Sequence, residues 1–337
     1  MAVVVRPTIV CMTPIRNESW ILKRFLSCAS MWADHIIIAD QASDDGSREI
    51  ALSFGKVTLV ENPSSVLNES ARQRVLINAA RQIASPRLLV ALDADEVLTA
   101  NFIGSPEWDT VLRTVPGTII QFEWINLLPD MHRCWRPGVH FAWAFMDDGS
   151  EHRGDLIHGN RLPVPATAAR LLLRDICVLH YQYTDWDRMA SKHRWYQCWE
   201  RLNRPWRRPS DIYRQYHHMY GVRPSEYQEV RREWFTGYRD RGIDMTSTVR
   251  DGVYWWDREV LAMLEEHGAE VFRREDIWNV DWMELGHKVG RDVPGVKARD
   301  PRRMPDRLVH GWLRRTQPFA NTRVGRAMDK PLRLLGW

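Results

Sequence analysis

Four short apolar runs dominate the first hundred residues, and longer segments with helical spacing separate them. The runs lie at residues 8–12, 34–40, 56–60 and 87–92. They are rich in branched residues and apolar on both faces, as expected of strands buried between two layers. Helical spacing occurs between them, at residues 18–32, 45–54 and 68–84. This alternation predicts an α/β fold, with a mostly parallel, Rossmann-like sheet flanked by helices.

The character of the chain changes near residue 185. Further strands are expected at residues 117–124 and 170–181. Helical spacing then returns at residues 185–202, 210–220, 225–241 and 250–267, and most of the 17 tryptophans lie after residue 181. We therefore expect an α/β domain over residues 1–185 and a mostly helical, Trp- and Arg-rich region over residues 186–337.

Composition excludes several classes of protein. Lys and Arg total 47 against 43 Asp and Glu, and a net charge of +4 is too small to indicate a nucleic-acid partner. The five cysteines are scattered without metal-ligand spacing, which fits a reduced cytoplasm. No apolar run reaches the roughly 18 residues of a membrane span. The short N-terminal run is broken by Arg6 and Pro7, which favours a strand over a signal peptide.

Polar residues follow three of the four predicted strands. They are Thr13, Pro14, Arg16, Asn17 and Glu18 after the first strand, residues 40–47 after the second, and Asp93, Ala94 and Asp95 after the fourth. Ligands of open parallel sheets bind at the carboxyl ends of the strands, where these residues would meet. A local interpretation competes, in which Asn17 or Asp45 caps a helix and Gly46 makes a turn.

The Asp93-Ala94-Asp95 segment indicates a metal site. An apolar strand delivers two carboxylates separated by one small residue. Carboxylate oxygens are the ligands that Mg²⁺ or Mn²⁺ prefers, often while the metal also bridges substrate phosphates. The alternative is a plain strand-to-helix turn with solvated acids.

These motifs together resemble the family 2 glycosyltransferases of the GT-A fold. Their second-strand signature is similar to residues 40–47 (DQASDDGS), and their metal-binding Asp-x-Asp is similar to residues 93–95. Residues 178–196 also resemble a stretch that closes the catalytic domain in bacterial lipopolysaccharide-core and capsule transferases. The resemblance spans about residues 8–196. It implies a metal-dependent, inverting transfer of a sugar from a nucleotide diphosphate-sugar, most often a UDP-sugar, to a hydroxyl of a glycan, lipid-linked or small-molecule acceptor.

The resemblance also implies roles for single residues. Asp40 matches the aspartate that reads the base, and either Arg72 or Arg74 matches an arginine near the nucleotide. The remaining implied roles are base contact by Thr13, Pro14, Arg16, Asn17 and Glu18, ribose or sugar contact by Asp93 and Ala94, metal binding by Asp95, and metal or diphosphate binding by His180. Lys192 is a candidate for the diphosphate oxygens. A core position for His180 and a solvated helix face for Lys192 are the competing interpretations.

The catalytic base of the resembled family has no counterpart at the matching position of this sequence. The resembled subgroup commonly has a glutamate directly after a histidine, whereas Gly159 follows His158 here. Local substitutes are Glu151, Asp155 and His158, with Asp147 and Asp148 as more distant candidates. An inverting transfer needs such a group to take the proton from the acceptor hydroxyl.

The aromatic and cationic residues after residue 185 allow three interpretations. Helix packing, a platform for sugar rings and an interfacial surface beside anionic lipid each fit the pattern. The region is therefore expected to bind the acceptor or to pack, with peripheral contact at the inner face of the membrane. Two other functions compete with sugar transfer. A nucleotidyltransferase would release pyrophosphate, and a non-catalytic carbohydrate- or membrane-binding protein would consume no donor.

Overall fold

A computed structural model describes residues 5–62, 64, 66–250, 252–290 and 298–337. These residues form two compact units. The first comprises the chain up to Thr184 together with Gln228–Val249, and the second comprises Asp185–Tyr227 and Arg250–Trp337. Residues 228–249, which the expected division at residue 185 assigns to the C-terminal region, belong to the first unit.

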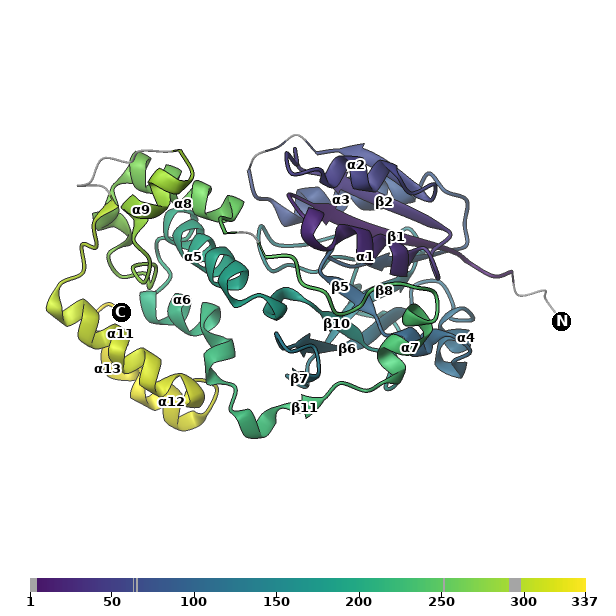
Figure 1. Cartoon of the computed structure of the whole chain (residues 1–337). Helices are drawn as coiled ribbons and strands as arrows, with labels where there is room; N and C mark the ends of the chain where they lie inside the picture. Colours follow the sequence, from purple (N-terminus) through teal and green to yellow (C-terminus); the bar gives the residue numbers. More distant parts are fainter. Residues whose placement is uncertain (1–4, 63, 65, 251, 291–297) are drawn as a thin grey trace. The chain divides into compact units, whose positions relative to one another are not determined.

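The first unit is a mixed α/β fold built on one sheet (Figure 1). Its strands are β1 (Thr8–Ile15), β2 (His35–Asp40), β3 (Val57–Glu61), β4 (Arg87–Ala91), β5 (Glu96–Leu98), β6 (Ile119–Leu127), β7 (Arg133–Trp135), β8 (His140–Met146), β9 (Arg170–Leu172), β10 (Val178–His180) and β11 (Gln228–Glu229). Its helices are α1 (Ser19–Ala29), α2 (Ser47–Leu52), α3 (Glu69–Ala80), α4 (Pro106–Val111) and α7 (Glu233–Arg239), with 3₁₀ turns at Ala100–Phe102 and Gln182–Thr184.

The strands β3, β2, β1 and β4 are neighbours in that order and run parallel. Along β1, Ile9 and Cys11 point to one face and Val10 and Met12 to the other, and both pairs are buried. The same alternation holds in β2 and β4. The predicted Rossmann-like α/β arrangement is therefore confirmed, because strands apolar on both faces must be covered on both faces.

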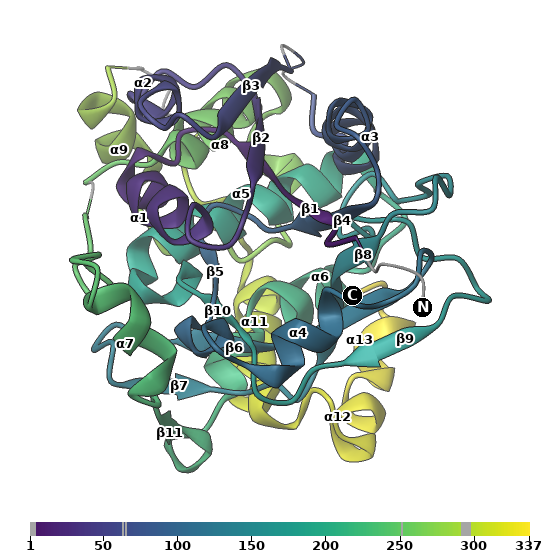
Figure 2. The same ribbon diagram turned by 90° about the vertical axis from the view of Figure 1, so that its right-hand side faces the viewer.

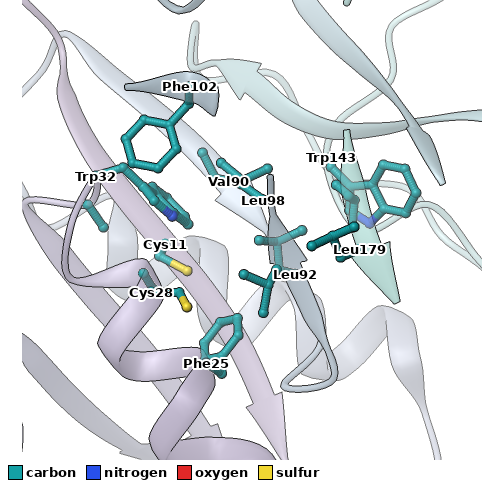
Figure 3. Close-up of a cluster of buried hydrophobic side chains, with 14 of the residues drawn as sticks. Cys11, Phe25, Cys28, Trp32, Val90, Leu92, Leu98, Phe102, Trp143 and Leu179 are labelled. Carbon is teal, nitrogen blue, oxygen red and sulfur yellow. The ribbon is translucent and has the colours of Figure 1, made fainter. Parts of the chain in front are cut away.

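Helices cover the two faces of these strands separately. Phe25 and Cys28 of α1 pack with Cys11 on one face (Figure 3). Leu76 and Ile77 of α3 cover the opposite face, and Figure 2 shows α1 and α3 on opposite sides of β1 and β2. The helix α3 begins where predicted, because the side chain of Asn68 accepts a hydrogen bond from the backbone N–H of Ala71.

The sheet continues through antiparallel strands that the sequence did not reveal. β8 pairs antiparallel with β4 and with β6, and β7 pairs antiparallel with β6. β10 lies between β6 and β5, so that His180 stands opposite Asn126 on one side and Glu96 on the other. This register brings the end of β10 next to β5, which directly follows the acidic residues 93–95.

The predicted helix at residues 225–241 is wrong over its first half. Pro224 opens a 3₁₀ turn, and the backbone that follows forms β11, in which Gln228 pairs with Cys134 of β7. Only Glu233–Arg239 is helical, and it buries Trp234, Phe235 and Tyr238 in the core of the first unit.

The second unit is helical, as predicted. Its helices are α5 (Trp186–Asn203), α6 (Pro209–Tyr216), α8 (Trp255–His267), α9 (Trp282–Lys288), α11 (Met304–Thr316), α12 (Arg323–Met328) and α13 (Lys330–Leu334), with 3₁₀ turns at His218–Gly221, Pro224–Glu226, Ala269–Phe272 and Gln317–Phe319. α5 packs on α8 and α6. Trp195 and Trp199 are buried, which supports packing, whereas Trp206 is 76% exposed. In the described segments of the chain, no helix has the length and apolar character needed to cross a membrane.

Asp147 joins three elements of the first unit. Its carboxylate is fully buried and accepts hydrogen bonds from Arg81 at the end of α3 (2.8 Å) and from Arg87 of β4 (2.7 Å). Burial alone would raise the pKa of Asp147, but these hydrogen bonds and one from the Gly149 N–H hold that pKa below its ordinary value. This ion pair makes Asp147 a structural residue and a poor proton acceptor.

We predict that Asp147→Asn lowers the free energy of unfolding by about 3 kcal/mol at pH 7, because two partly buried guanidinium groups lose their charged partner. The lowered pKa means that the stabilisation is present above about pH 4 and is lost as the pH falls through the folded-state value. Urea unfolding at several pH values should therefore show a constant difference from wild type above pH 5 and a smaller one at pH 3. Asp148→Asn, at the exposed neighbouring acid, is the control, and an equal effect of both variants would contradict the assignment.

Candidate active site

The loops after β1 and β2 are locked together by hydrogen bonds. Asn17 has a φ of 56°, and its side chain donates to Asp44 Oδ1 (2.8 Å) and accepts from the Asp44 N–H (2.9 Å). The backbone N–H of Glu18 donates to Ser47 Oγ (2.8 Å). Asn17 and Glu18 therefore shape the edge of the sheet, whatever else they contact.

Asp40 ends β2 with a buried carboxylate. Its Oδ1 accepts from the Ser43 N–H (3.1 Å), and its Oδ2 is 3.3 Å from Arg48, which also pairs with Glu61. Each oxygen keeps a lone pair beyond these contacts, so the carboxylate can accept a further hydrogen bond. Thr13 and Pro14 are buried, while Arg16 is partly exposed.

Arg161 binds two carboxylates of the acidic segment after β4. Its guanidinium donates to Asp93 Oδ2 (2.5 Å) and to the buried carboxylate of Glu96. Glu96 also accepts from the Asp93 N–H (3.0 Å) and from the Trp143 indole (3.2 Å). Burial works against the charged guanidinium, yet Asp93 and Glu96 hold the pKa of Arg161 above its ordinary range. Asp93 is thus fixed by contacts on both its backbone and its side chain, and Ala94 beside it is buried.

Asp95 and His180 meet at the same edge. His180 Nδ1 lies 2.8 Å from the side-chain oxygen of Asn126, which accepts a hydrogen bond from it, and Nε2 is the ring nitrogen that faces Asp95. Nε2 lies 3.6 Å from Asp95 Oδ2. The ring stacks on Trp124, with centroids 4.3 Å apart and planes 26° apart. His180 is therefore held in one orientation by a hydrogen bond and a stacked ring.

The Asp95–His180 pair is a candidate for contact with a divalent cation. Metal–ligand distances of about 2.1 Å allow two ligand atoms 3.6 Å apart to share an ion. Within the described part of the chain, no group of three or more His, Cys, Asp or Glu side chains gathers as a complete metal cage. Mg²⁺ and similar ions commonly take one or two protein ligands and complete their shell with phosphates and water. The residues present fit that kind of site.

The structure separates Arg72 from Arg74. Arg74 is exposed and donates to Ser70 of its own helix (2.6 Å). Arg72 lies near Glu69, and no acceptor among the described residues contacts its buried Nε. Arg72 is therefore the better candidate for a ligand contact, because a buried donor without a partner favours an incoming acceptor.

The expected base candidates lie in an exposed segment. Glu151, Asp155 and His158 are all exposed, and Glu151 pairs only loosely with Arg153 (3.2 Å). His158 has a φ of 58°.

Gly159 has a structural reason to be glycine. A Cβ at this position would lie 2.6 Å from the backbone nitrogen and 3.2 Å from the carbonyl oxygen of Asp155. The tight fold of this segment lets the Gly159 N–H reach Glu69 Oε2 (3.3 Å). The glutamate that the family resemblance places here cannot fit without moving the backbone.

Glu69 and Arg161 are the site residues that sequence reasoning missed. Burial raises the pKa of Glu69, although Arg72 works against the rise, and Asp93 is close enough to add to it. Glu69 reads in the sequence as an ordinary acid in the first turn of a helix, and Arg161 as a surface arginine. Their role is visible only once residues 155–161 fold back over the acidic edge.

Lys192 belongs to the second unit. It lies on α5, with Nζ 5.9 Å from the centroid of the Trp256 ring. A contact between Lys192 and diphosphate oxygens stays a prediction.

No protein-family model matches the sequence, and no curated protein matches it. Solved structures share weak likeness with it, among them these two. One is a 4-diphosphocytidyl-2C-methyl-D-erythritol synthase, with 14% identity, 27% of this chain covered and a TM-score of 0.22. The other is HddC from Yersinia pseudotuberculosis, with 11% identity, 42% of this chain and 74% of that chain covered, and a TM-score of 0.25. The match spans about half (47%) of the synthase chain. Similarity at this level says nothing about activity.

We predict that Gly159→Ala destabilises the first unit by about 1–3 kcal/mol, because the new methyl group overlaps the Asp155 backbone. Gly159→Glu, which restores the residue expected from the family resemblance, should be at least as damaging. Gly55→Ala is the control, since a Cβ there meets nothing within 4 Å. Thermal and urea unfolding measure the effect, and a Gly159→Glu protein as stable as wild type would show that the segment is not so constrained.

Proposed function

We propose that this chain is a metal-dependent, inverting glycosyltransferase that uses a nucleotide diphosphate-sugar, a UDP-sugar, as donor. The observation that carries the proposal is the approach of His180 to Asp95 after the carboxyl end of β4, two residues beyond Asp93, which Arg161 holds. Asp40 at the end of the neighbouring strand would read the base of the nucleotide, as the family resemblance implies. The family resemblance of the same residues points to the same chemistry.

Asp95 and His180 would hold Mn²⁺ or Mg²⁺. Such an ion, when bound, neutralises negative charge that develops on the leaving diphosphate. His180 is kept in place by Asn126 and Trp124. Arg72 would donate to phosphate oxygens, and Arg161 fixes the Asp93 carboxylate for a hydroxyl of the ribose or sugar.

The acceptor hydroxyl must lose its proton as the anomeric carbon is attacked from the face opposite the diphosphate. Asp155, His158 and Glu151 stay candidates for this step, and Glu69 joins them. The raised pKa of the Glu69 carboxyl makes it a stronger base, and its neighbours Arg72 and Asp93 belong to the proposed donor site.

The acceptor is proposed to be a hydroxyl of a glycan, lipid-linked or small-molecule substrate. Peripheral contact with a membrane is supported by α11, where Met304, Leu308 and Trp312 recur every fourth residue and are 69%, 68% and 43% exposed. Arg303 and Arg307 flank this apolar stripe and are exposed themselves. An apolar stripe bordered by arginines fits a surface of anionic lipid.

We expect UDP-sugars with Mn²⁺ to stabilise the protein in a thermal-shift assay and to be consumed with release of nucleoside diphosphate. A ligand at 100 times its Kd stabilises by about 2.7 kcal/mol. Asp95→Asn should remove the metal-dependent part of both effects, whereas Asp109→Asn, at an exposed acid of α4, should change neither. The proposal fails if no nucleotide-sugar binds or if Asp95→Asn behaves as wild type.

The released product separates the competing functions in the same assay. Pyrophosphate would identify a nucleotidyltransferase, and glycan binding without donor consumption would identify a non-catalytic protein. Glu69→Gln should lower turnover by about 10²–10⁴-fold while donor binding persists. If Glu69→Gln keeps full turnover, the base is another residue. It is then the one among Asp155, His158 and Glu151 whose substitution (Asp155→Asn, His158→Gln or Glu151→Gln) abolishes turnover.

For the membrane contact, we predict that the protein co-sediments with vesicles containing anionic phosphatidylglycerol more than with neutral phosphatidylcholine vesicles. Leu308→Glu should abolish this binding, because it places a charge in the apolar stripe. Val115→Glu is the control, since Val115 is a comparably exposed (66%) apolar residue of the first unit. Unchanged sedimentation of Leu308→Glu would rule out α11 as the contact.

A further inference from the structure

The second unit contains a cavity of about 380 Å³ that the proposed transfer reaction does not use. Side chains from α5, α6 and α11 line it, together with those of Tyr220 and Asp276. Small-molecule sites commonly have volumes of about 300–1,000 Å³, so the cavity has room for a compact ligand. All of its lining residues belong to the second unit.

Flat aromatic groups form part of the wall. Tyr213 and His217 stack with centroids 3.9 Å apart and planes 5° apart. Tyr220 lies beside His217, with centroids 5.8 Å apart, and is 54% exposed. Aromatic faces pack against the C–H face of a sugar ring, while nearby polar groups take its hydroxyls.

Two arginines, Arg194 and Arg314, and one carboxylate, Asp276, line the cavity. The buried Asp276 carboxylate is approached by His217 Nε2 (3.3 Å), Arg302 (3.3 Å) and Arg314 (3.6 Å). Arg302 has a second carboxylate partner in Asp300 (3.0 Å). The side chain of Arg314 is 67% exposed, so its guanidinium is open to a ligand as well as to Asp276.

Arg194 adds a second cation to the wall. One of its terminal nitrogens donates to Asp257 (3.0 Å), and its side chain is only 9% exposed. No acceptor among the described residues contacts its Nε. A buried guanidinium N–H without a partner costs free energy unless a ligand supplies an acceptor, and anionic oxygens are its strongest partners.

We propose that this cavity binds a sugar that carries a phosphate or a carboxylate group. The sugar ring would lie against Tyr220, and the anionic group would contact Arg194 and Arg314. Asp276 would accept hydrogen bonds from the hydroxyls of the ring. The binding does not depend on the donor site of the first unit, so it holds or fails independently of the transfer reaction.

Isothermal titration of the full chain tests the proposal without nucleotide or metal. The probes are glucose, galactose and mannose, the 6-phosphate and the uronate of each, and inorganic phosphate. At least one phosphorylated or acidic sugar should bind ten or more times more tightly than both its neutral parent and inorganic phosphate. Preference for the 6-phosphates or for the uronates identifies which anionic group the site takes.

Two variants locate the binding. Arg314→Gln should weaken binding of the preferred sugar at least tenfold, whereas Arg315→Gln, next to it on α11 and outside the cavity, should stay within about twofold of wild type. Tyr220→Ala should weaken sugar binding more than phosphate binding. Far-ultraviolet circular dichroism and thermal unfolding verify that each variant is folded.

Three results would overturn the proposal. They are no binding by any sugar of the panel, equal binding of neutral and anionic sugars, and equal losses for Arg314→Gln and Arg315→Gln. Binding of inorganic phosphate as tight as that of the best sugar would reduce the cavity to a simple anion site and would also refute it.

Discussion

The buried carboxylate of Glu96 is the constraint around which the candidate site is organised. A buried carboxylate is tolerated only when charge and hydrogen bonds compensate it, and Arg161 and Trp143 supply both. Because Arg161 comes from the segment after β8, its ion pair draws that segment to the end of β4. The same guanidinium fixes Asp93. The order of the acidic edge therefore depends on one contact between parts of the chain 65 residues apart.

The sheet could be predicted because its information is local. Strands apolar on both faces, such as β2 with Ile36, Ile37 and Ile38 all buried, identify themselves by composition alone. The start of α3 is equally local, since Asn68 caps it. The family resemblance implied metal binding by Asp95 and metal or diphosphate binding by His180, and the structure brings these two side chains within 3.6 Å of each other.

The remaining features of the site and the fold depend on contacts between residues far apart in the sequence, which a local sequence pattern does not reveal. Glu69 differs from any other helix-starting acid only because the Gly159 N–H reaches it from 90 residues away. Asn17 was predicted to contact the base or to cap a helix; Glu18 is the N-cap residue of α1, and the Asn17 side chain bonds Asp44 across two loops. Residues 228 and 229 lie within a helical sequence pattern, but they form a strand because they pair with the edge of β7. In each case a distant partner outweighed a local preference.

The path of the chain through the two units has a consequence for synthesis on the ribosome. The chain leaves the first unit at residue 184, builds part of the second, and returns with residues 228–249 before leaving again. Trp234, Phe235 and Tyr238 arrive on that return and fill the core beside Phe102. Until about residue 249 has emerged, this apolar surface stays open to water and to other nascent chains. Most of the α/β unit is thus synthesised first, but its core is completed late. A chaperone has the most time to bind the exposed core in that interval.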